Sequence, residues 1–217
     1  MNFPEGATIL GASPSRHGLA EALRRAPALV CADGGANALP EGAAPEAIIG
    51  DLDSLADAEG WRARLGARLV HVAEQESTDL EKCLRHVDAP FLIGVGFLGG
   101  RLDHELAALH AMIAEPRPLL LIGEEDVALS AGTALSLDPP AGDRLSIYPL
   151  RPVRALAGSG LRWPIDGLEM EAAGRIGTSN QTTGPVSMRF DRPGAVVILP
   201  RARLDAALRG LLNRPRP

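Results

Sequence analysis

The order of the apolar segments predicts an α/β domain followed by an antiparallel β-sandwich. In the first 125 residues, short apolar runs alternate with helical patterns, which is typical of a parallel sheet with crossover helices. Those runs are Thr8–Leu10, Ala28–Ala32, Ala47–Ile49, Arg68–Val72, Phe91–Val95 and Leu119–Ile122. After residue 125 the runs are short and alternating, with Gly, Pro and Asp between them and no helix of useful length, which predicts a small antiparallel sheet or sandwich. They are Ala134–Leu137, Leu145–Tyr148, Leu168–Glu171, Val186–Phe190 and Ala195–Leu199. We therefore expect two domains, at residues 1–125 and 126–217.

Local signals predict where several helices begin. Thr78 and Glu81 have the spacing of a capping box, so one helix should begin near Asp79. A second helix should begin near Asp103, and Ser54 is a candidate cap for a third. The second helix should bury one apolar face, and a short closing helix should follow the last strand. The apolar residues of these two helices are Leu106, Leu109, Met112 and Ile113, and then Leu204, Leu208, Leu211 and Leu212.

The composition is that of a globular protein and argues against several functional classes. The apolar fraction of 46% is enough for a core, and the net charge of −5 argues against a nucleic-acid-binding surface. Cys31 and Cys83 are too few for a disulfide framework, so we expect buried free thiols and a cytoplasmic location. The first twenty residues lack a signal-peptide pattern, and no apolar run approaches about 18 residues, so no membrane span is predicted.

Five aspartates stand where a parallel sheet would place catalytic groups, namely Asp33, Asp51, Asp53, Asp79 and Asp103. Each follows a short apolar run, and open α/β sheets bind their ligands at the carboxyl ends of the strands. Because alternate residues of a strand share a face, Asp51 and Asp53 could direct both carboxylates at one metal ion. Oxygen ligands suit Mg²⁺, which usually binds together with phosphates. The sequence therefore favours a Mg²⁺-dependent nucleotide enzyme.

Each aspartate also has a purely structural explanation, as a turn residue or in the first turn of a helix. The residues before Asp103 favour a ligand site instead. Gly99 and Gly100 would let the backbone approach a ligand closely, and Arg101 could hold phosphate oxygens. The start of the helix that follows would add a partial positive charge for anions.

Other nucleotide and phosphate motifs fit the chain less well. The glycines of residues 94–99 match a dinucleotide-binding pattern, but they come late in the chain and no acidic strand end follows at the distance that a ribose requires. Residues 51–54 resemble the motif of aspartyl-phosphate phosphatases, in which Asp51 would be the nucleophile, but the later acidic pair is missing. The sequence contains no Walker lysine loop, which excludes a P-loop kinase.

Two segments of the C-terminal part are candidates for ligand contacts. Trp163 is one of two tryptophans and could belong to the sandwich core or form a platform for a ligand. Ser179 and Asn180 lie in a polar cluster between predicted strands, where they could be turn formers or ligand contacts.

Six segments, in order, resemble the thiamin pyrophosphokinase family over nearly the whole chain. They are residues 32–37, 50–54, 75 with 77–82, 99–104, 160–163 and 178–180. The resemblance implies an α/β domain joined to a β-sandwich and a homodimer with active sites between the subunits. It also implies transfer of a diphosphate from ATP to the hydroxyethyl group of thiamine, with Mg²⁺ as the metal and release of AMP.

The resemblance also implies roles for individual residues. The catalytic positions around Mg²⁺ and the ATP phosphates are Asp51, Asp53, Asp79 and Asp103, of which Asp51, Asp53 and Asp79 would hold the metal ion. The other matched positions that would bind ATP or thiamine are Asp33, Asn37, Gln75, Lys82, Gly99, Gly100, Arg101 and His104, with Trp163, Ser179 and Asn180 near thiamine. The chain departs from the family at Leu52, where many members have Phe, and in the short segment after Asn180.

Three other functions remain open from the sequence. They are a diphosphokinase that acts on a pterin-type hydroxymethyl acceptor, a non-catalytic sensor of thiamine or nucleotide, and an aspartyl phosphatase. The complete set of five aspartates argues against a sensor with a degraded site. A product assay distinguishes the four functions, because AMP release would depend on thiamine, on a pterin, or would not occur.

Overall fold

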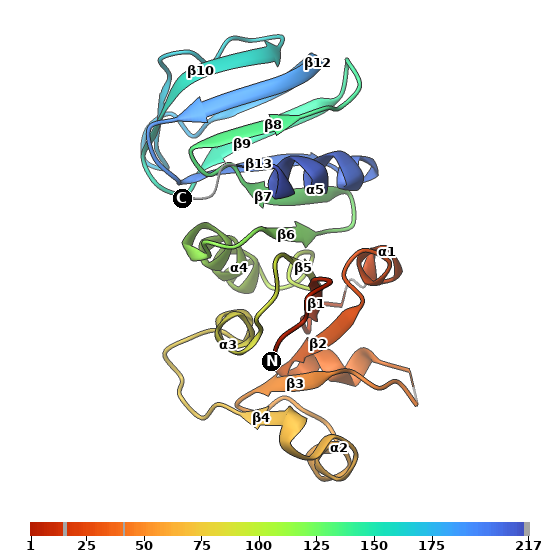
Figure 1. Ribbon diagram of the computed structural model, residues 1–217. Helices are drawn as coiled ribbons and strands as arrows, with labels where there is room; N and C mark the ends of the chain where they lie inside the picture. Colours follow the sequence, from red (N-terminus) through yellow and green to blue (C-terminus); the bar gives the residue numbers. More distant parts are fainter. Residues whose placement is uncertain (15–16, 41, 215–217) are drawn as a thin grey trace. The chain divides into compact units, whose positions relative to one another are not determined.

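Parallel strands and helices alternate along the first half of this computed structural model, which describes residues 1–14, 17–40 and 42–214. The strands are β1 (Ala7–Leu10), β2 (Ala28–Ala32), β3 (Ala47–Gly50), β4 (Leu69–His71), β5 (Leu92–Val95) and β6 (Leu119–Ile122) (Figure 1). They follow the order β6-β5-β1-β2-β3-β4, and the pairs from β5 to β4 are parallel. Every residue of β1, β3, β5 and β6 is buried, which is why these strands are continuous apolar runs in the sequence.

Short helices connect these strands. They are α1 (Leu19–Leu23), the 3₁₀ helix η1 (Asp33–Ala38), α2 (Ala58–Leu65), the 3₁₀ helix η2 (Gly66–Arg68), α3 (Asp79–His86) and α4 (Leu102–Ala114). Helix α3 packs against β2 and β3, and α1 packs against β1 and β5. The predicted helix starts near residues 79 and 103 are thus confirmed.

The caps of two helices test the local predictions. The capping box of α3 is present, since Thr78 Oγ1 accepts a hydrogen bond from the Glu81 amide at 3.3 Å and Glu81 Oε2 accepts one from the Thr78 amide at 2.9 Å. The prediction that Ser54 caps a helix is wrong. The cap of α2 is Asp57, whose Oδ1 accepts a hydrogen bond from the Gly60 amide at 3.1 Å.

The buried face of α4 is narrower than predicted. Met112 and Ile113 are buried as expected, together with Ala108 and Ala111. Leu106 is 52% exposed, so its assignment to the apolar face is wrong. Ala108 and Ala111 are buried in α4, where the sequence pattern predicted that Leu106 would be.

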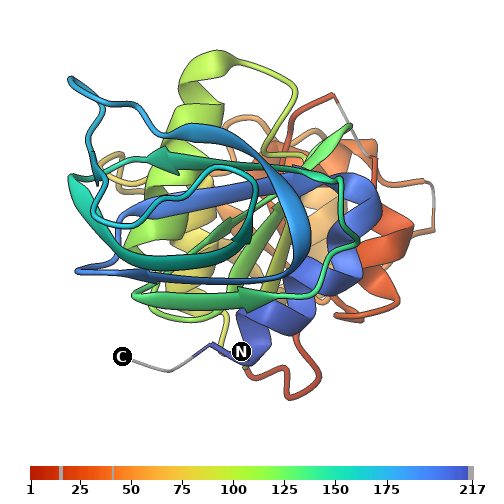
Figure 2. The ribbon, with the colours of Figure 1, turned by 90° about the horizontal axis from the view of Figure 1, so that it is seen from above.

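The C-terminal half is an antiparallel β structure with one closing helix. Its strands are β7 (Asp126–Ser130), β8 (Ala134–Leu137), β9 (Arg144–Pro149), β10 (Val153–Leu161), β11 (Glu169–Met170), β12 (Thr178–Phe190) and β13 (Ala195–Pro200), followed by η3 (Arg201–Arg203) and α5 (Leu204–Leu212). They follow the order β11-β10-β12-β9-β13-β7, and β8 also pairs with β12 (Figure 1). Figure 2 shows the same strands from above. The first part of β12 pairs with β9 and its last part pairs with β8. This one long strand therefore belongs to both sheets of the sandwich.

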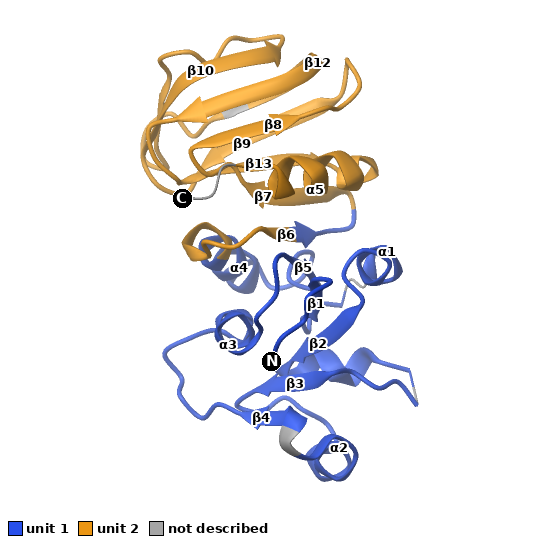
Figure 3. Cartoon of the chain, viewed as in Figure 1, with its two compact units in different colours: residues 1–111, 121–124 blue, residues 112–120, 125–217 orange. Residues whose placement is uncertain are grey.

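The chain divides into two compact units, which are coloured in Figure 3. The first contains residues 1–111 and 121–124, and the second contains residues 112–120 and 125–217. Both cysteines are buried and neither forms a disulfide, as predicted. Within the described residues, no helix has the length and apolar character that a membrane span requires.

Three strand predictions need correction. Strands β7 and β10 are missing from the predicted strands, and in β10 Gly158 and Gly160 interrupt the apolar pattern. Strand β12 begins at Thr178, so Ser179 and Asn180 lie within a strand and not between strands. Helix α5 agrees with the predicted closing helix, and it approaches β8 so closely that a Cβ on Gly210 would lie 2.4 Å from the Ser136 carbonyl oxygen.

Candidate active site

A cavity of about 600 Å³ in the first unit is lined by the segments that follow β1, β2, β3 and β5 and by the first turns of α3 and α4. Most of the predicted site residues of this unit line it: Asp51, Asp53, Gln75, Asp79, Lys82, Gly100, Arg101 and His104. The cavity therefore lies where the parallel sheet is expected to bind its ligand.

Sequence reasoning missed part of the lining. Ser13 and Phe97 lie in loops after β1 and β5, and Ser54, Ser77 and Thr78 come from the loops around the acidic residues. Ser13 also braces the loop after β5, because its Oγ donates to the Leu98 carbonyl oxygen at 3.1 Å. Ser13 could have been found from its position shortly after the first apolar run, at the same edge of the sheet as the aspartates.

Three carboxylates meet beside this cavity. One oxygen each from Asp33, Asp51 and Asp79 lies within 4.8 Å of the other two. Asp33 begins η1 with a left-handed φ of 41°, which turns its side chain under the end of β3. A Cβ on Gly50 would lie 2.6 Å from the Asp33 Cβ. A glycine at the end of β3 is therefore necessary for Asp33 to join the cluster.

Asp33 is the most perturbed member of the cluster. It is 1% exposed, and burial raises its pKa to about 6, with further contributions from the neighbouring carboxylates Asp79, Asp51 and Asp53. The Ser54 amide opposes this shift by donating to Asp33 Oδ2 at 3.2 Å. Among the described residues, Oδ1 of Asp33 has no hydrogen-bond partner. A buried carboxylate oxygen that lacks a donor, on a residue grouped with two other carboxylates, fits a hard divalent cation such as Mg²⁺.

The ammonium group of Lys82 lies beside the carboxylate cluster and partly balances its negative charge. Its side chain is 2% exposed, and its Nζ lies 3.3 Å from Asp51 Oδ2 and 3.3 Å from Asp79 Oδ1. Gln75 Nε2 also donates to Asp51 Oδ2, at 2.7 Å. The nearest donor to Asp51 Oδ1 is the Asp53 amide, at the long distance of 3.5 Å. That oxygen of Asp51 is therefore the one best placed to bind a cation.

The pKa directions agree with this arrangement. Burial alone would raise the pKa of Asp51, but the hydrogen bonds from Gln75 and Lys82 outweigh it and the pKa is lowered. Burial does raise the pKa of Asp79, against the attraction of Lys82. Although burial opposes it, the bonds to the two carboxylates raise the pKa of Lys82, so the ammonium stays charged.

Asp53 does not follow the strand geometry predicted for it. Strand β3 ends at Gly50, and Leu52 has a left-handed φ of 65°, so the alternation of strand side chains does not extend to Asp51 and Asp53. Asp53 lines the cavity, and its Oδ1 accepts a hydrogen bond from Ser54 Oγ at 2.9 Å. The metal-binding role of Asp53 stays a prediction, whereas Asp33 joins the candidate ligands.

Asn37 holds the loop that follows these aspartates. Its Nδ2 donates to the Ser54 carbonyl oxygen at 2.7 Å, and its Oδ1 accepts from the Ala56 amide at 2.8 Å. Both ends of the side-chain amide are thus used within the protein. This geometry favours a positioning role for Asn37 over the predicted contact with a ligand.

The donors of the glycine loop are paired with carboxylates of α4. The amides of Gly99 and Gly100 donate to Glu105 Oε1 at 3.0 and 2.8 Å. Arg101 makes two hydrogen bonds to Asp103, at 3.1 and 2.6 Å, and this contact lowers the pKa of the exposed Asp103 carboxyl. A phosphate that binds here through Arg101 must compete with Asp103. The predicted catalytic role of Asp103 stays a prediction.

The three residues expected near thiamine all lie in the second unit. Trp163 follows β10 and is 51% exposed, with the Arg162 guanidinium carbon 5.0 Å from its ring centroid. Ser179 is exposed on β12, and Asn180 beside it is buried. Trp163 is therefore not a core residue of the sandwich, and its ring is accessible to a ligand.

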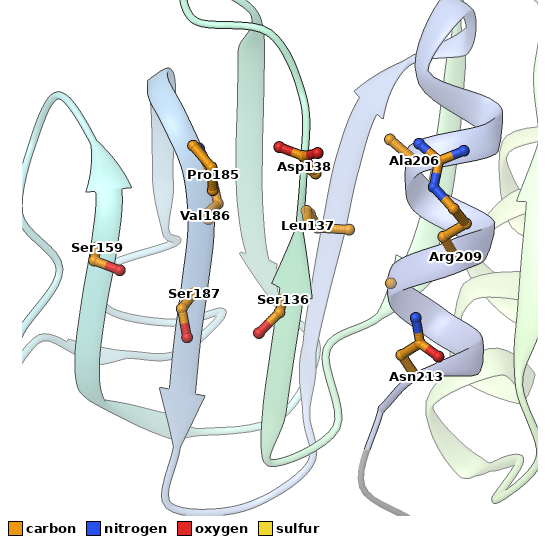
Figure 4. A pocket seen from close by; sticks show the side chains of 11 residues that line it. Ser136, Leu137, Asp138, Ser159, Pro185, Val186, Ser187, Ala206, Arg209 and Asn213 are labelled. Atoms are coloured by element: carbon orange, nitrogen blue, oxygen red, sulfur yellow. The ribbon is translucent and has the colours of Figure 1, made fainter.

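A second cavity, of about 420 Å³, lies between α5 and strands β8, β10 and β12 (Figure 4). Ser136, Ser187 and Ser159 form a row across these strands, because each is paired with the next in the strand register. Arg209 lines the side formed by α5. All predicted site residues belong to the part of the chain that the structure describes, and none of them lines this cavity. The first cavity is therefore the candidate active site.

We expect Asp33→Asn to stabilise the fold near pH 7 in metal-free buffer. The folded-state pKa of about 6 lies above the ordinary value of 3.8, so the free energy of unfolding falls as pH rises between these values. Asn removes this loss and can still accept from the Ser54 amide. The gain should be roughly 1–3 kcal/mol near pH 7 and should vanish near pH 4.

Urea unfolding followed by circular dichroism at both pH values measures this effect. Asp138→Asn, a similar change at an exposed aspartate, should leave the pH profile unchanged. A variant that is less stable than the parent at both pH values would show that the buried charge of Asp33 does not lower the free energy of unfolding.

Two domain models of one known family match this chain. The model described as "Thiamin pyrophosphokinase, catalytic domain" matches residues 19–119, and "Thiamin pyrophosphokinase, vitamin B1 binding domain" matches residues 134–193. Thiamine pyrophosphokinase 1 of Oryza sativa subsp. japonica is 29% identical over 190 residues, which cover 72% of this chain and 72% of that protein.

Solved structures show the same fold. The thiamin pyrophosphokinase from Candida albicans superimposes with a TM-score of 0.77 at 15% identity and covers 91% of this chain and 89% of its own. The one from Geobacillus thermodenitrificans gives a TM-score of 0.70 at 21% identity, covering 92% of this chain and 97% of its own. With both domain models matched in order, the chain belongs to the thiamin pyrophosphokinase family.

Proposed function

We propose that this chain is a thiamine diphosphokinase, which transfers the diphosphate of ATP to the hydroxyl of the thiamine hydroxyethyl group. One observation carries the proposal beyond family membership. Three carboxylates lie within 4.8 Å of one another beside a cavity at the carboxyl ends of the parallel strands, and one buried oxygen lacks a donor. This arrangement supports a site for a divalent cation with a polyphosphate.

The reaction forms one bond to phosphorus and breaks another. The hydroxyl oxygen of thiamine attacks the β-phosphorus of ATP, the bond from that phosphorus to the α-phosphate bridging oxygen breaks, and AMP leaves. A carboxylate near the hydroxyl accepts its proton. Mg²⁺, when bound, would neutralise charge on the phosphate oxygens, and Asp33, Asp51 and Asp79 are the residues that would hold it. Lys82 keeps Asp51 ionised and fixed in place.

A product assay tests the proposal. Purified protein with Mg²⁺, ATP and labelled thiamine should give thiamine diphosphate and AMP in equal amounts. Thiamine monophosphate with ADP would contradict the diphosphoryl step. AMP release that depends on a hydroxymethyl pterin and not on thiamine would support the alternative diphosphokinase, and binding without turnover would support a sensor.

Arg101→Ala should weaken the use of ATP more than the use of thiamine. Arg101 lines the cavity but is 70% exposed and already paired with Asp103, so we expect a rise of about tenfold in the apparent constant for ATP. Initial rates with each substrate varied in turn measure the effect. Arg192→Ala, which removes an exposed arginine paired with Asp191 in the second unit, is the matched control. A change confined to thiamine saturation would place Arg101 at the thiamine end of the site.

We also propose that the active enzyme is a homodimer in which the second unit of one subunit completes the site of its partner. The acidic cluster belongs to the first unit, whereas the residues expected near thiamine belong to the second. Two buried cysteines that form no disulfide support a reducing compartment such as the cytosol.

Mixing two inactive variants tests the shared site. Asp53→Asn and Trp163→Ala, after subunit exchange, should form mixed dimers in which one site carries both changes and the other carries neither. Random pairing then restores about one quarter of the sites. A protein with both changes in the same chain, mixed with the parent, is the control for exchange. No recovery after verified exchange would indicate that each site is built within one chain.

A further inference from the structure

We infer that Asn180 is a positioning residue, which fixes the backbone of Trp163 for thiamine binding and does not itself contact thiamine. The inference rests on the proposed function, because the orientation of Trp163 matters to activity only if the second unit binds thiamine. The structural part of the inference concerns the unliganded protein and can be tested separately.

The side-chain amide of Asn180 is almost fully used within the protein. It is 3% exposed. Its Oδ1 accepts hydrogen bonds from the amides of Trp163 at 3.1 Å and Gln181 at 2.9 Å, and its Nδ2 donates to the Trp163 carbonyl oxygen at 2.7 Å. An asparagine side chain has two donor and two acceptor positions, so three of the four are occupied. One N–H is left for any other contact.

The hydrogen bonds from the Asn180 side chain take the place of the backbone bonds that a neighbouring strand would make. Within an antiparallel ladder, a residue in a hydrogen-bonded pair exchanges its N–H and C=O with one residue of the neighbouring strand. Strand β10 ends at Leu161, which is paired with Thr182, and the Arg162 amide still donates to the Gln181 carbonyl oxygen at 2.8 Å. Trp163 lies beyond the end of the strand. The Asn180 side chain binds the N–H and C=O of Trp163 as a neighbouring strand would.

The ring of Trp163 needs this support because the fold gives it little packing. It is 51% exposed, and the Arg162 guanidinium carbon lies 5.0 Å from its centroid. Arg162 is itself held by a hydrogen bond to Gln181 Oε1 at 3.0 Å. One face of the ring is therefore next to a fixed cation, and the opposite face is the one open to the cationic thiazolium of thiamine. Attraction between a cation and an aromatic face requires a distance within about 6 Å of the centroid, so a loose backbone would lower the affinity.

A single-tryptophan protein gives a direct readout of this position. Trp61 is buried in α2 of the first unit, and Trp61→Phe leaves Trp163 as the sole indole. In this background, without thiamine or ATP, Asn180→Ala should lower the fluorescence anisotropy of Trp163 and increase its quenching by acrylamide. The same change should raise KM for thiamine by up to about tenfold and leave KM for ATP unchanged.

Two further variants control for folding and for changes near the site. Asn180→Asp keeps the accepting oxygen but places a carboxylate oxygen against the Trp163 carbonyl oxygen, so it should loosen Trp163 at least as much as Ala does. Thr183→Ala changes an exposed residue of the same strand and should alter neither fluorescence nor KM. Circular dichroism confirms the fold of each variant.

The outcomes separate the inference from the proposed function. A higher KM for thiamine with unchanged Trp163 fluorescence would overturn the inference and make Asn180 a direct thiamine contact. If Trp163 is loosened but the KM for thiamine is unchanged, the position of Trp163 does not affect thiamine binding, and that part of the inference fails. If the parent protein does not use thiamine, the proposed function fails, while the fluorescence of the unliganded variants still shows whether Asn180 fixes Trp163.

Discussion

Asp51→Asn should lower turnover by about 100-fold or more while the fold survives. Asn has the same shape and can still accept hydrogen bonds from Gln75 and Lys82, which lie 2.7 and 3.3 Å from Asp51 Oδ2. The change removes the negative charge that would hold Mg²⁺ against the ATP phosphates. Steady-state turnover at saturating thiamine and ATP, together with the circular dichroism spectrum, measures both parts of the expectation.

The matched control is Asp138→Asn, an exposed aspartate of the second unit. It should retain the turnover of the parent. Excess Mg²⁺ should recover only a small part of the lost activity of Asp51→Asn, because a neutral amide is a weaker ligand than a carboxylate. Near-normal turnover in a folded Asp51→Asn protein would make Asp51 a residue of the turn after β3 and nothing more.

Lys82→Met should lower the free energy of unfolding by about 3 kcal/mol in metal-free buffer near pH 7. Met keeps the apolar stem but removes the ammonium from between Asp51 and Asp79. Loss of one partner of a buried ion pair costs about 3–5 kcal/mol, and the lower end applies because Asp79 is 40% exposed. The carboxylates would then repel one another without compensation.

Urea unfolding with and without Mg²⁺ measures this effect. Mg²⁺ should restore more stability to Lys82→Met than to the parent, because the unpaired carboxylates would bind it more tightly. The deficit should also shrink at low pH as the carboxylates become neutral. Asp51→Asn combined with Lys82→Met should cost less than the sum of the two changes. Equal stability of the variant and the parent would show that the ammonium does not balance the cluster.

The parallel strands β1, β3 and β5 could be predicted from the sequence to within about two residues because every residue in them is buried. The start of β12 could not be predicted in this way. Ser179 and Asn180 have the composition of a turn, and they belong to a strand because they pair with Ser146 and Leu145 of β9.

The acidic site was predictable as a set of residues but not as a geometry. The position of each aspartate after an apolar run placed it at one edge of the sheet. The inclusion of Asp33 in the cluster depends on its left-handed backbone and on the space beside Gly50, and the turn at Leu52 separates Asp53 from the strand pattern. These features arise from contacts between segments far apart in sequence, which a local pattern does not contain.

The burial of Lys82 has a chemical consequence, because it is the only lysine in the chain. Its side chain is 2% exposed, so reagents that acylate amines should modify the folded protein at the Met1 amino group alone. The rate at which an acylating reagent reaches Lys82 then reports how often α3 and the loop before it open. A ligand that closes the site should slow this reaction, so mass spectrometry of acylation at one residue measures the dynamics of the site.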